Sequence, residues 1–286
     1  PTPTIPPPTP TIPPPTPTLL PPTPSPVPTP WHLVVAADDY NGDGTADCGL
    51  WRGGDGTFRI RDLSLVYYGL SGDVPVPGDY GGDGRADYAV WRPSSGKWSI
   101  RGLSNGANHY YGQNGDIPAI ADYDGDWRTD TALYRPSIGK WFIRGQTTFY
   151  YGLHTDTPIP GDYDGDGTAD PALFRPFAGG AAWYIRHLTL LYYGQSYDLP
   201  VPGDYLGDGT TRLSVFRPSA GRWYIRGEPY VSFGQDGDIP FALDFSGDGT
   251  FQRGLYRPGQ GRWSVYALTG FYFGSSGDQP VSGRSY

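Results

Sequence analysis

The sequence contains no methionine, one cysteine and one glutamate, and only two of its 21 basic residues are lysines. Methionine, glutamate and lysine are good helix formers, so their scarcity argues against a helical fold. The 43 glycines and 32 prolines break helices, and the aromatic residues, 15% of the chain, favour strands. We therefore expect an all-β fold.

A single cysteine excludes an intrachain disulfide, so cysteine usage does not reveal the redox compartment. We expect Cys48 to be a semi-buried, unreactive thiol. No apolar run approaches the roughly 20 residues that a membrane-spanning helix needs, and we expect no membrane span. Because the chain begins at Pro1 and has no methionine, we also expect that a leader has been removed or precedes Pro1.

The charge and the motifs exclude several classes of function. The formal net charge of -8 argues against phosphate or nucleic-acid binding. The chain has no nucleophile elbow, no P-loop and no His-Glu-x-x-His motif, and its four histidines occupy unrelated positions of the repeat described below. We therefore expect the protein not to be an enzyme.

Residues 1–30 consist mostly of proline and threonine in a degenerate seven-residue repeat that begins PTPTIPP. Proline fixes φ and lacks an N–H, so we expect a polyproline II tail that reaches roughly 90 Å. Proline-flanked threonines are typical of O-glycosylated stalks, and a flexible linker is the alternative. The predicted glycosylation sites are Thr2, Thr4, Thr9, Thr11, Thr16, Thr18, Thr23 and Thr29.

From Asp39 onward the chain repeats every 40 to 43 residues, a spacing typical of β-propeller blades. Each of the six copies has four short strand candidates separated by turn residues. We therefore predict a six-repeat β-propeller of four-stranded blades over residues 31–286, preceded by the tail.

Two recurring residues have structural roles in this prediction. In stretches such as KWSIR, alternation puts Trp98 and Ile100 on one face, so we expect the recurring tryptophans to pack between blades. The arginine of each Arg-Pro corner is expected to pair with an aspartate that precedes the first strand of a blade. These aspartates are Asp73, Asp116, Asp156, Asp198, Asp238 and Asp278.

The two ends of the repeat region compete for one strand. The stretch WHLVVAADD is expected to supply the first strand of the first blade, yet PVSGRSY begins a seventh copy and stops. One strand is then redundant, or one terminus pairs outside its own ring, since unpaired strand edges readily accept partners.

The start of each copy carries an aspartate-rich loop, DYDGDGTAD in the fourth. Oxygen ligands at loop positions 1, 3, 5 and 9, with a backbone carbonyl near position 7, suit Ca²⁺, which takes about six to eight oxygens. An EF-hand is disfavoured because no glutamate follows at position 12. The predicted ligands are Asp39, Asn41, Asp43, Thr45 and Asp47; Asp79, Asp83 and Asp87; Asp122, Asp124, Asp126, Arg128 and Asp130; and Asp162, Asp164, Asp166, Thr168 and Asp170.

The fifth and sixth copies are poor calcium sites. The fifth has Leu206 and Arg212 at positions 3 and 9, and the sixth has Ser246 and Gln252 there. We expect calcium in three or four of the six loops. For any single loop, the alternative is a self-capped turn without metal.

The pattern D-x-D-G-D-G-x-x-D, followed by (A/S)-(V/L)-aromatic-Arg-Pro and a later tryptophan, resembles the FG-GAP/VCBS repeat family, which is related to the integrin α-subunit propeller. The resemblance covers residues 31–286. It implies calcium loops between the first two strands of the blades, an extracellular location, and adhesion or carbohydrate-binding roles. The fifth and sixth copies depart from the metal pattern, so their sites are not carried over.

The function predicted from the sequence is a non-enzymatic, secreted or cell-surface structural protein. Its calcium-stiffened propellers form a filament or surface appendage through self-assembly, and the Pro/Thr tail binds a neighbour or carries covalent O-glycans. The alternative is a stalked lectin or adhesin that binds a carbohydrate ligand.

Overall fold

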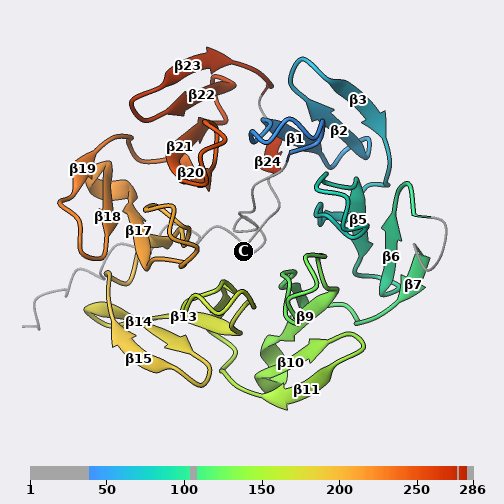
Figure 1. The fold of residues 1–286 in the computed structure, drawn as a ribbon, viewed down its shortest axis with the longest axis horizontal. Coiled ribbons are helices and arrows are strands. Elements are labelled where there is room, and N and C mark those ends of the chain that lie inside the picture. Colours follow the sequence, from blue (N-terminus) through green and yellow to red (C-terminus); the bar gives the residue numbers. More distant parts are fainter. Residues whose placement is uncertain (1–38, 104–107, 276, 282–286) are drawn as a thin grey trace, which may run out of the picture.

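The structure, a computed structural model, describes residues 39–281 except 104–107 and 276, and it is a ring of six four-stranded antiparallel sheets (Figure 1). The first three blades comprise β24 (Gln279–Val281), β1 (Gly49–Arg52), β2 (Thr57–Ile60) and β3 (Ser64–Tyr67); β4 (Val74–Pro75), β5 (Ala89–Arg92), β6 (Lys97–Ile100) and β7 (Asn108–Tyr110); and β8 (Ile117–Pro118), β9 (Ala132–Arg135), β10 (Lys140–Ile143) and β11 (Thr147–Tyr150).

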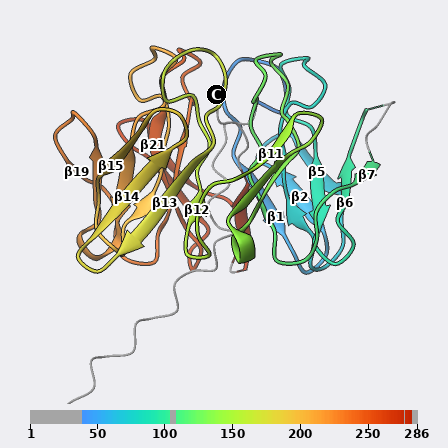
Figure 2. The ribbon, with the colours of Figure 1, turned by 90° about the horizontal axis from the view of Figure 1, so that it is seen from below.

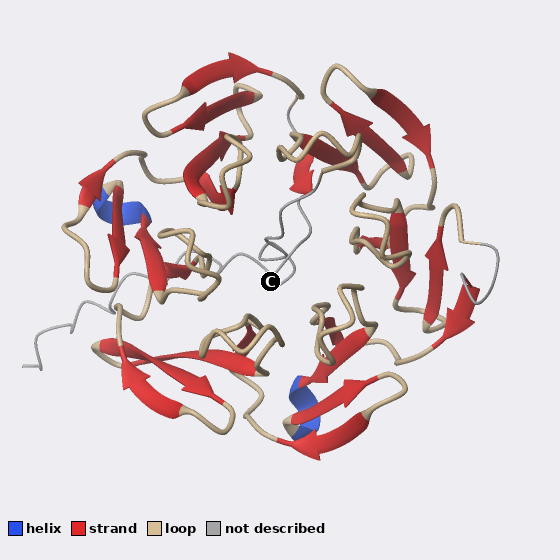
Figure 3. Cartoon of the chain, viewed as in Figure 1, coloured by secondary structure: helices blue, strands red, loops and turns tan. Residues whose placement is uncertain are grey.

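The other three comprise β12 (Thr157–Pro158), β13 (Ala172–Phe177), β14 (Gly180–Ile185) and β15 (Thr189–Tyr192); β16 (Leu199–Pro200), β17 (Ser214–Arg217), β18 (Arg222–Ile225) and β19 (Val231–Ser232); and β20 (Ile239–Leu243), β21 (Gln252–Arg257), β22 (Arg262–Val265) and β23 (Thr269–Tyr272). Among the described residues the only helices are two short 3-10 turns, Pro136–Ile138 and Pro218–Ala220 (Figure 3). The predicted all-β propeller with six four-stranded blades is confirmed, whereas the predicted tail lies outside the described residues.

The turn between the second and third strands of a blade requires glycine in five blades. In the third blade Gly139 has a φ of 60°, and a Cβ added there would lie 2.1 Å from the carbonyl oxygen of Gly152. A side chain at this position would therefore meet both a left-handed backbone and a backbone atom. Gly56, Gly96, Gly221 and Gly261 repeat this close approach, and Ala181 takes the equivalent place in the fourth blade. In five blades the glycine therefore keeps the hairpin tight against the end of the outermost strand.

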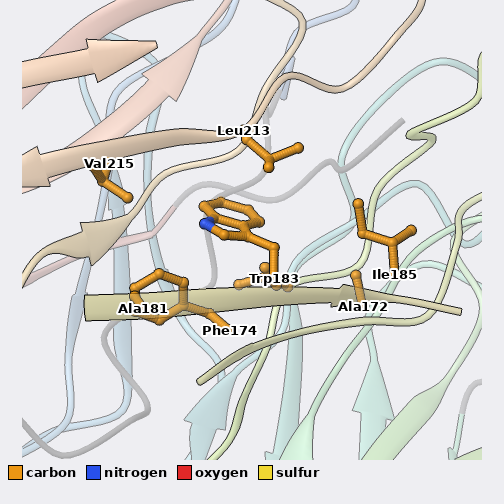
Figure 4. Packing of buried hydrophobic residues seen from close by; sticks show 8 residues of the cluster. Ala172, Phe174, Ala181, Trp183, Ile185, Leu213 and Val215 are labelled. Atoms are coloured by element: carbon orange, nitrogen blue, oxygen red, sulfur yellow. The ribbon is translucent and has the colours of Figure 1, made fainter. Parts of the chain in front are cut away.

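The recurring tryptophans are buried and pack between blades, as predicted. Trp183 on β14 is fully buried and lies in one cluster with Leu213 and Val215 of the next blade (Figure 4). Its indole N–H donates a hydrogen bond of 3.0 Å to the carbonyl of Tyr193. The equivalent indoles of Trp98, Trp141 and Trp263 also donate to a backbone carbonyl, whereas that of Trp223 is buried without a partner. Each blade thus contributes a large apolar ring to the contact with a neighbour, Phe58 in the first blade.

The predicted arginine–aspartate pairs are also present. In the third blade Arg135 donates from Nε and Nη2 to the two carboxylate oxygens of Asp116, at 2.6 and 2.8 Å, and the Asp116 side chain is almost completely buried. The same bidentate ion pair joins Arg52 to Asp278, Arg92 to Asp73, Arg175 to Asp156, Arg217 to Asp198 and Arg257 to Asp238. Each pair ties the start of a blade's innermost strand to the end of its second strand.

The first blade is closed by the C-terminal segment. Strand β24 pairs antiparallel with β1, with Val281 opposite Gly49, and Arg52 holds Asp278 just before β24. The expectation that residues 31–39 supply the innermost strand was therefore wrong, because β24 takes that position beside β1. The C-terminal strand closes its own ring, and residues 31–38 lie outside the described residues.

The single cysteine is more deeply buried than the sequence predicted. Cys48 is 6% exposed at the start of the first blade, and burial raises the pKa of its thiol to about 12. Because the thiolate is the reactive form, this environment makes the cysteine inert at neutral pH.

Candidate metal centres

Six aspartate-rich loops gather around the central axis of the ring (Figure 1), at one end of it, as the side view shows (Figure 2). In blades two to six each loop connects the innermost strand with the second strand, and in the first blade it precedes β1. We number these loops one to six with their blades and use positions 1 to 9 within each. Position 1 is Asp39, Asp79, Asp122, Asp162, Asp204 or Asp244.

The aspartate at position 1 builds the turn in all six loops. In loop four one oxygen of Asp162 accepts the backbone N–H of Gly165 at 2.6 Å, and the other accepts that of Gly167 at 2.8 Å. Asp204 in loop five accepts the corresponding pair, from Gly207 and Gly209, at 2.7 Å each. Position 1 therefore stabilises the loop whether or not the rest of a ligand set is present.

Position 9 distinguishes the first four loops from the last two. Asp170 accepts the backbone N–H of Tyr163 at 3.0 Å, and Asp47, Asp87 and Asp130 make the same contact in their own loops. Burial, followed by the charges of neighbouring carboxylates, raises the pKa of each of these four aspartates to about 6. Burial and neighbouring charges thus disfavour the ionised form of each carboxylate, and a bound cation would stabilise that form.

Two loops bring three carboxylates together. Oxygen atoms of Asp122, Asp124 and Asp130 lie within 4.8 Å of one another, and so do those of Asp162, Asp164 and Asp170. Loop one has Asn41 at position 3, and loop two has Gly81. The residues of loops three and four therefore fit a divalent cation with oxygen ligands, and loop one keeps an oxygen ligand at each of the same positions.

The predicted ligands at positions 5 and 7 have mainly local partners. Asp166 lies outside the group of converging carboxylates and accepts both the backbone N–H and the hydroxyl of Thr168, at 2.8 and 2.6 Å. Asp43 and Thr45 repeat both contacts, and the N–H of Arg128 donates to Asp126. The threonine hydroxyls thus face position 5, which leaves the backbone carbonyl as the oxygen that position 7 can offer a metal.

The loops are joined to one another in a closed circle, which the sequence did not indicate. The backbone N–H at position 8 of each loop donates to the carbonyl of position 1 in the preceding loop, at 2.6 to 2.9 Å. Ala46 closes the circle by donating to Asp244 of loop six. The other donors are Ala86, Thr129, Ala169, Thr211 and Phe251. Because both partners are backbone groups, no side-chain pattern reveals them.

The remaining predicted features have no role in these loops. His109 lies on β7 and stacks against Trp98, with ring centroids 5.9 Å apart, so it belongs to the packing of its blade. All eight threonines predicted to carry glycans lie outside the described residues. The described residues include no helix that could span a bilayer.

The chain matches no protein-family profile and no curated protein. Among solved structures, an Agrocybe aegerita lectin that specifically recognises non-reducing terminal N-acetylglucosamine is 15% identical; the match covers 81% of this chain and 87% of that one, with a TM-score of 0.46. A structure of BBS1N in complex with ARL6DN, soaked with lead, is 11% identical over 82% of this chain and 78% of that one, with a TM-score of 0.49. At such identities a similarity concerns the fold alone.

Proposed function

We propose that the chain is a non-enzymatic, extracellular structural protein, a calcium-stiffened propeller that forms a filament or surface appendage. Its Pro/Thr segment contacts a neighbouring subunit or carries O-linked glycans. The observation that carries the proposal is the pairing of β24 with β1. All six blades are complete within residues 49–281, so the ring requires no strand from the segment before Asp39.

In this proposal three or four calcium ions are held, in loops one, three and four and, as the weakest ligand set, in loop two. The carboxylates at positions 1 and 9, the side chain at position 3 where it offers an oxygen, and the carbonyl of position 7 are the ligands. In loop four these are Asp162, Asp170, Asp164 and the carbonyl of Thr168. The acidic groups at positions 3 and 9 and the raised pKa of position 9 support this assignment. The same loop spacing supports membership of the FG-GAP/VCBS repeat family.

Calcium would stiffen more than the loop that binds it. The residue at position 1 offers its side chain to the metal, and its carbonyl accepts a hydrogen bond from the next loop. A metal that fixes position 1 therefore also restrains the neighbouring blade at position 8, one residue before that blade's own ligand. A ring with several such links resists the separation of its blades, which suits a subunit that bears load.

The experiment that tests the proposal is deletion of residues 1–30. We expect the shortened chain to remain a folded monomer and to lose assembly, as measured by light scattering and electron microscopy. A matched control replaces residues 1–30 by a Gly/Ser segment of equal length, which keeps the length but not the polyproline II conformation. A full-length protein that stays monomeric under all conditions would contradict the proposal.

One observation favours the lectin alternative. The last residue of the outermost strand is a tyrosine in five blades, and each of these tyrosines is 72 or 73% exposed. They are Tyr67, Tyr110, Tyr150, Tyr192 and Tyr272, and the fifth blade has Ser232 instead. Exposed aromatic rings can stack against sugar rings. A glycan array separates the two functions: specific sugar binding that is lost when the five tyrosines are changed to serine would favour the lectin.

A further inference from the structure

The side chains at position 9 of loops five and six donate hydrogen bonds, whereas those of the other four loops are carboxylates. We propose that Gln252 and Arg212 replace the cation in their loops, so that the protein itself holds these two loops and calcium can occupy only the other four. The inference rests on the proposed calcium sites and concerns the two loops whose residues do not fit a metal.

Gln252 connects the atoms that would be ligands in loop six. Its side-chain oxygen accepts the N–H of Phe245 at 2.6 Å, as the carboxylate at position 9 does elsewhere. Its Nε2 donates to the hydroxyl of Ser246 at position 3, at 2.9 Å, and to the carbonyl of Thr250 at position 7, at 2.6 Å. One amide therefore accepts the hydrogen bond of the turn and also donates to the oxygens of positions 3 and 7, which in the other loops would coordinate a metal.

Arg212 makes comparable contacts in loop five. Its guanidinium forms an ion pair with Asp208 at position 5, and its Nη1 donates to the carbonyl of Thr210 at position 7, at 3.2 Å. A positive charge on the protein thus contacts a carboxylate and the carbonyl that a calcium ion would use in the other loops. Leu206 at position 3 offers no oxygen, so a metal would also lack a ligand there.

The other loops have no such donor at position 9. A carboxylate at neutral pH accepts hydrogen bonds only, so Asp47, Asp87, Asp130 and Asp170 cannot donate to the oxygens that converge with them. Side-chain amides contact two of these carboxylates: Asn41 donates to Asp47 at 3.4 Å and Gln146 to Asp130 at 2.8 Å. An external cation is the partner that can contact the converging oxygens of one loop together. Loops five and six are adjacent, and Phe251 donates to the carbonyl of Asp204 between them at 2.7 Å. The ring therefore has one continuous arc whose loops keep their structure without calcium.

The variant Gln252→Asp tests the inference. It gives loop six Asp244, Ser246, Asp248 and a carboxylate at position 9, a set close to that of loop one. In the full-length protein we expect one more bound calcium per chain than in the parent, measured by titration calorimetry. In EDTA the variant should melt a few degrees below the parent, because about 1 kcal/mol lowers Tm by roughly 2–4 °C in a domain of this size. Calcium should raise the Tm of the variant back to that of the parent.

Gln252→Ala is the matched control, since it removes the same hydrogen bonds without adding a carboxylate. We expect it to melt below the parent both in EDTA and in calcium, and to bind no additional ion. A second variant, Arg212→Asp, gives loop five the ligand pattern of loop two. If loop two binds a calcium ion, we expect this variant to bind one ion more than the parent. If loop two binds none, we expect the variant and the parent to bind the same number of ions.

The outcomes separate this inference from the proposed function. If the parent binds calcium and Gln252→Asp folds but binds no more than the parent, the inference is wrong and the four sites stand. If Gln252→Ala melts in EDTA at the parent's temperature, the hydrogen bonds of Gln252 do not replace a metal, and the inference is again wrong. A parent that binds no calcium overturns both the sites and the inference.

Discussion

Two aspartates of the same loop have different tasks at the residue scale. Asp162 accepts backbone N–H groups from within its turn, and the equivalent aspartate does so in all six loops. Asp170 accepts one N–H and adds a charge whose ionised form is disfavoured by burial. Position 1 therefore builds the loop, and in the proposed function position 9 decides whether the loop needs a cation.

The variant Asp170→Asn tests the role of the charge at position 9. Asparagine keeps an oxygen for the N–H of Tyr163 and removes the charge. Because the pKa of Asp170 is raised to about 6 in the folded state, its ionised form opposes folding once the pH rises through that value. Without calcium at pH 7.5 the amide should therefore stabilise the protein, by about 1 kcal/mol after allowance for solvent screening.

Thermal melting in EDTA and calcium titration check this variant. We expect a Tm equal to or above that of the parent in EDTA, and one bound calcium fewer. Asp236→Asn, a change of an exposed aspartate outside the six loops, is the control and should alter neither quantity. If Asp170→Asn binds as many ions as the parent, Asp170 is not a ligand.

At the scale of strands and blades, most of the architecture could be predicted because each blade repeats the same chemistry. The alternation in KWSIR identified Trp98 as a core residue, and the aspartate before each first strand identified the partner of each arginine. The strand that closes the ring was assigned to the wrong terminus. Hydrophobicity favoured WHLVVAADD, but Asp278 before Gln-Pro-Val repeats the arrangement of Asp73 before Val-Pro-Val, and that signal indicated the C-terminal segment.

The closing strand can be tested through its arginine. Arg52→Ala leaves the buried carboxylate of Asp278 without its cation, which should cost about 2–3 kcal/mol, less than for a fully buried pair because Arg52 is partly exposed. Arg92→Ala breaks an equally exposed pair inside a continuous blade and should cost a similar amount. Only Arg52→Ala should also accelerate hydrogen exchange of the amides of β24. Equal exchange of β24 in both variants would show that the pair does not hold the strand.

At the scale of the whole molecule, the circle of backbone hydrogen bonds joins the loops into one unit. The loops could be predicted from the sequence, but the circle could not. Its hydrogen bonds join the backbone N–H of position 8 to the backbone carbonyl of position 1, and the residue types at these positions do not indicate such bonds. The circle depends on how the blades close, which the spacing of one repeat does not specify. The side-chain contacts of Gln252 and Arg212 lie within their own loops, so the residue types at position 9 are visible in the sequence, but the oxygens to which they donate are not.

Calcium should therefore affect the stability of the whole ring. An ion that binds only the folded state stabilises it by RT ln(1 + [L]/Kd), which is about 2.7 kcal/mol for each site at a concentration 100 times its Kd. We expect EDTA to lower the Tm and calcium to restore it. Hydrogen exchange in EDTA should increase in loops one to four and much less in loops five and six. A uniform increase over all six loops would contradict the division of the ring.

The number of calcium ions bound by the full-length chain, counted by native mass spectrometry at saturating calcium, decides whether the loops are metal centres. The ligand sets of loops one to four predict three or four ions per chain, with loop two as the site that decides between these numbers. No bound calcium would contradict the assignment of the loops as metal centres, and six ions would contradict the roles given to Arg212 and Gln252.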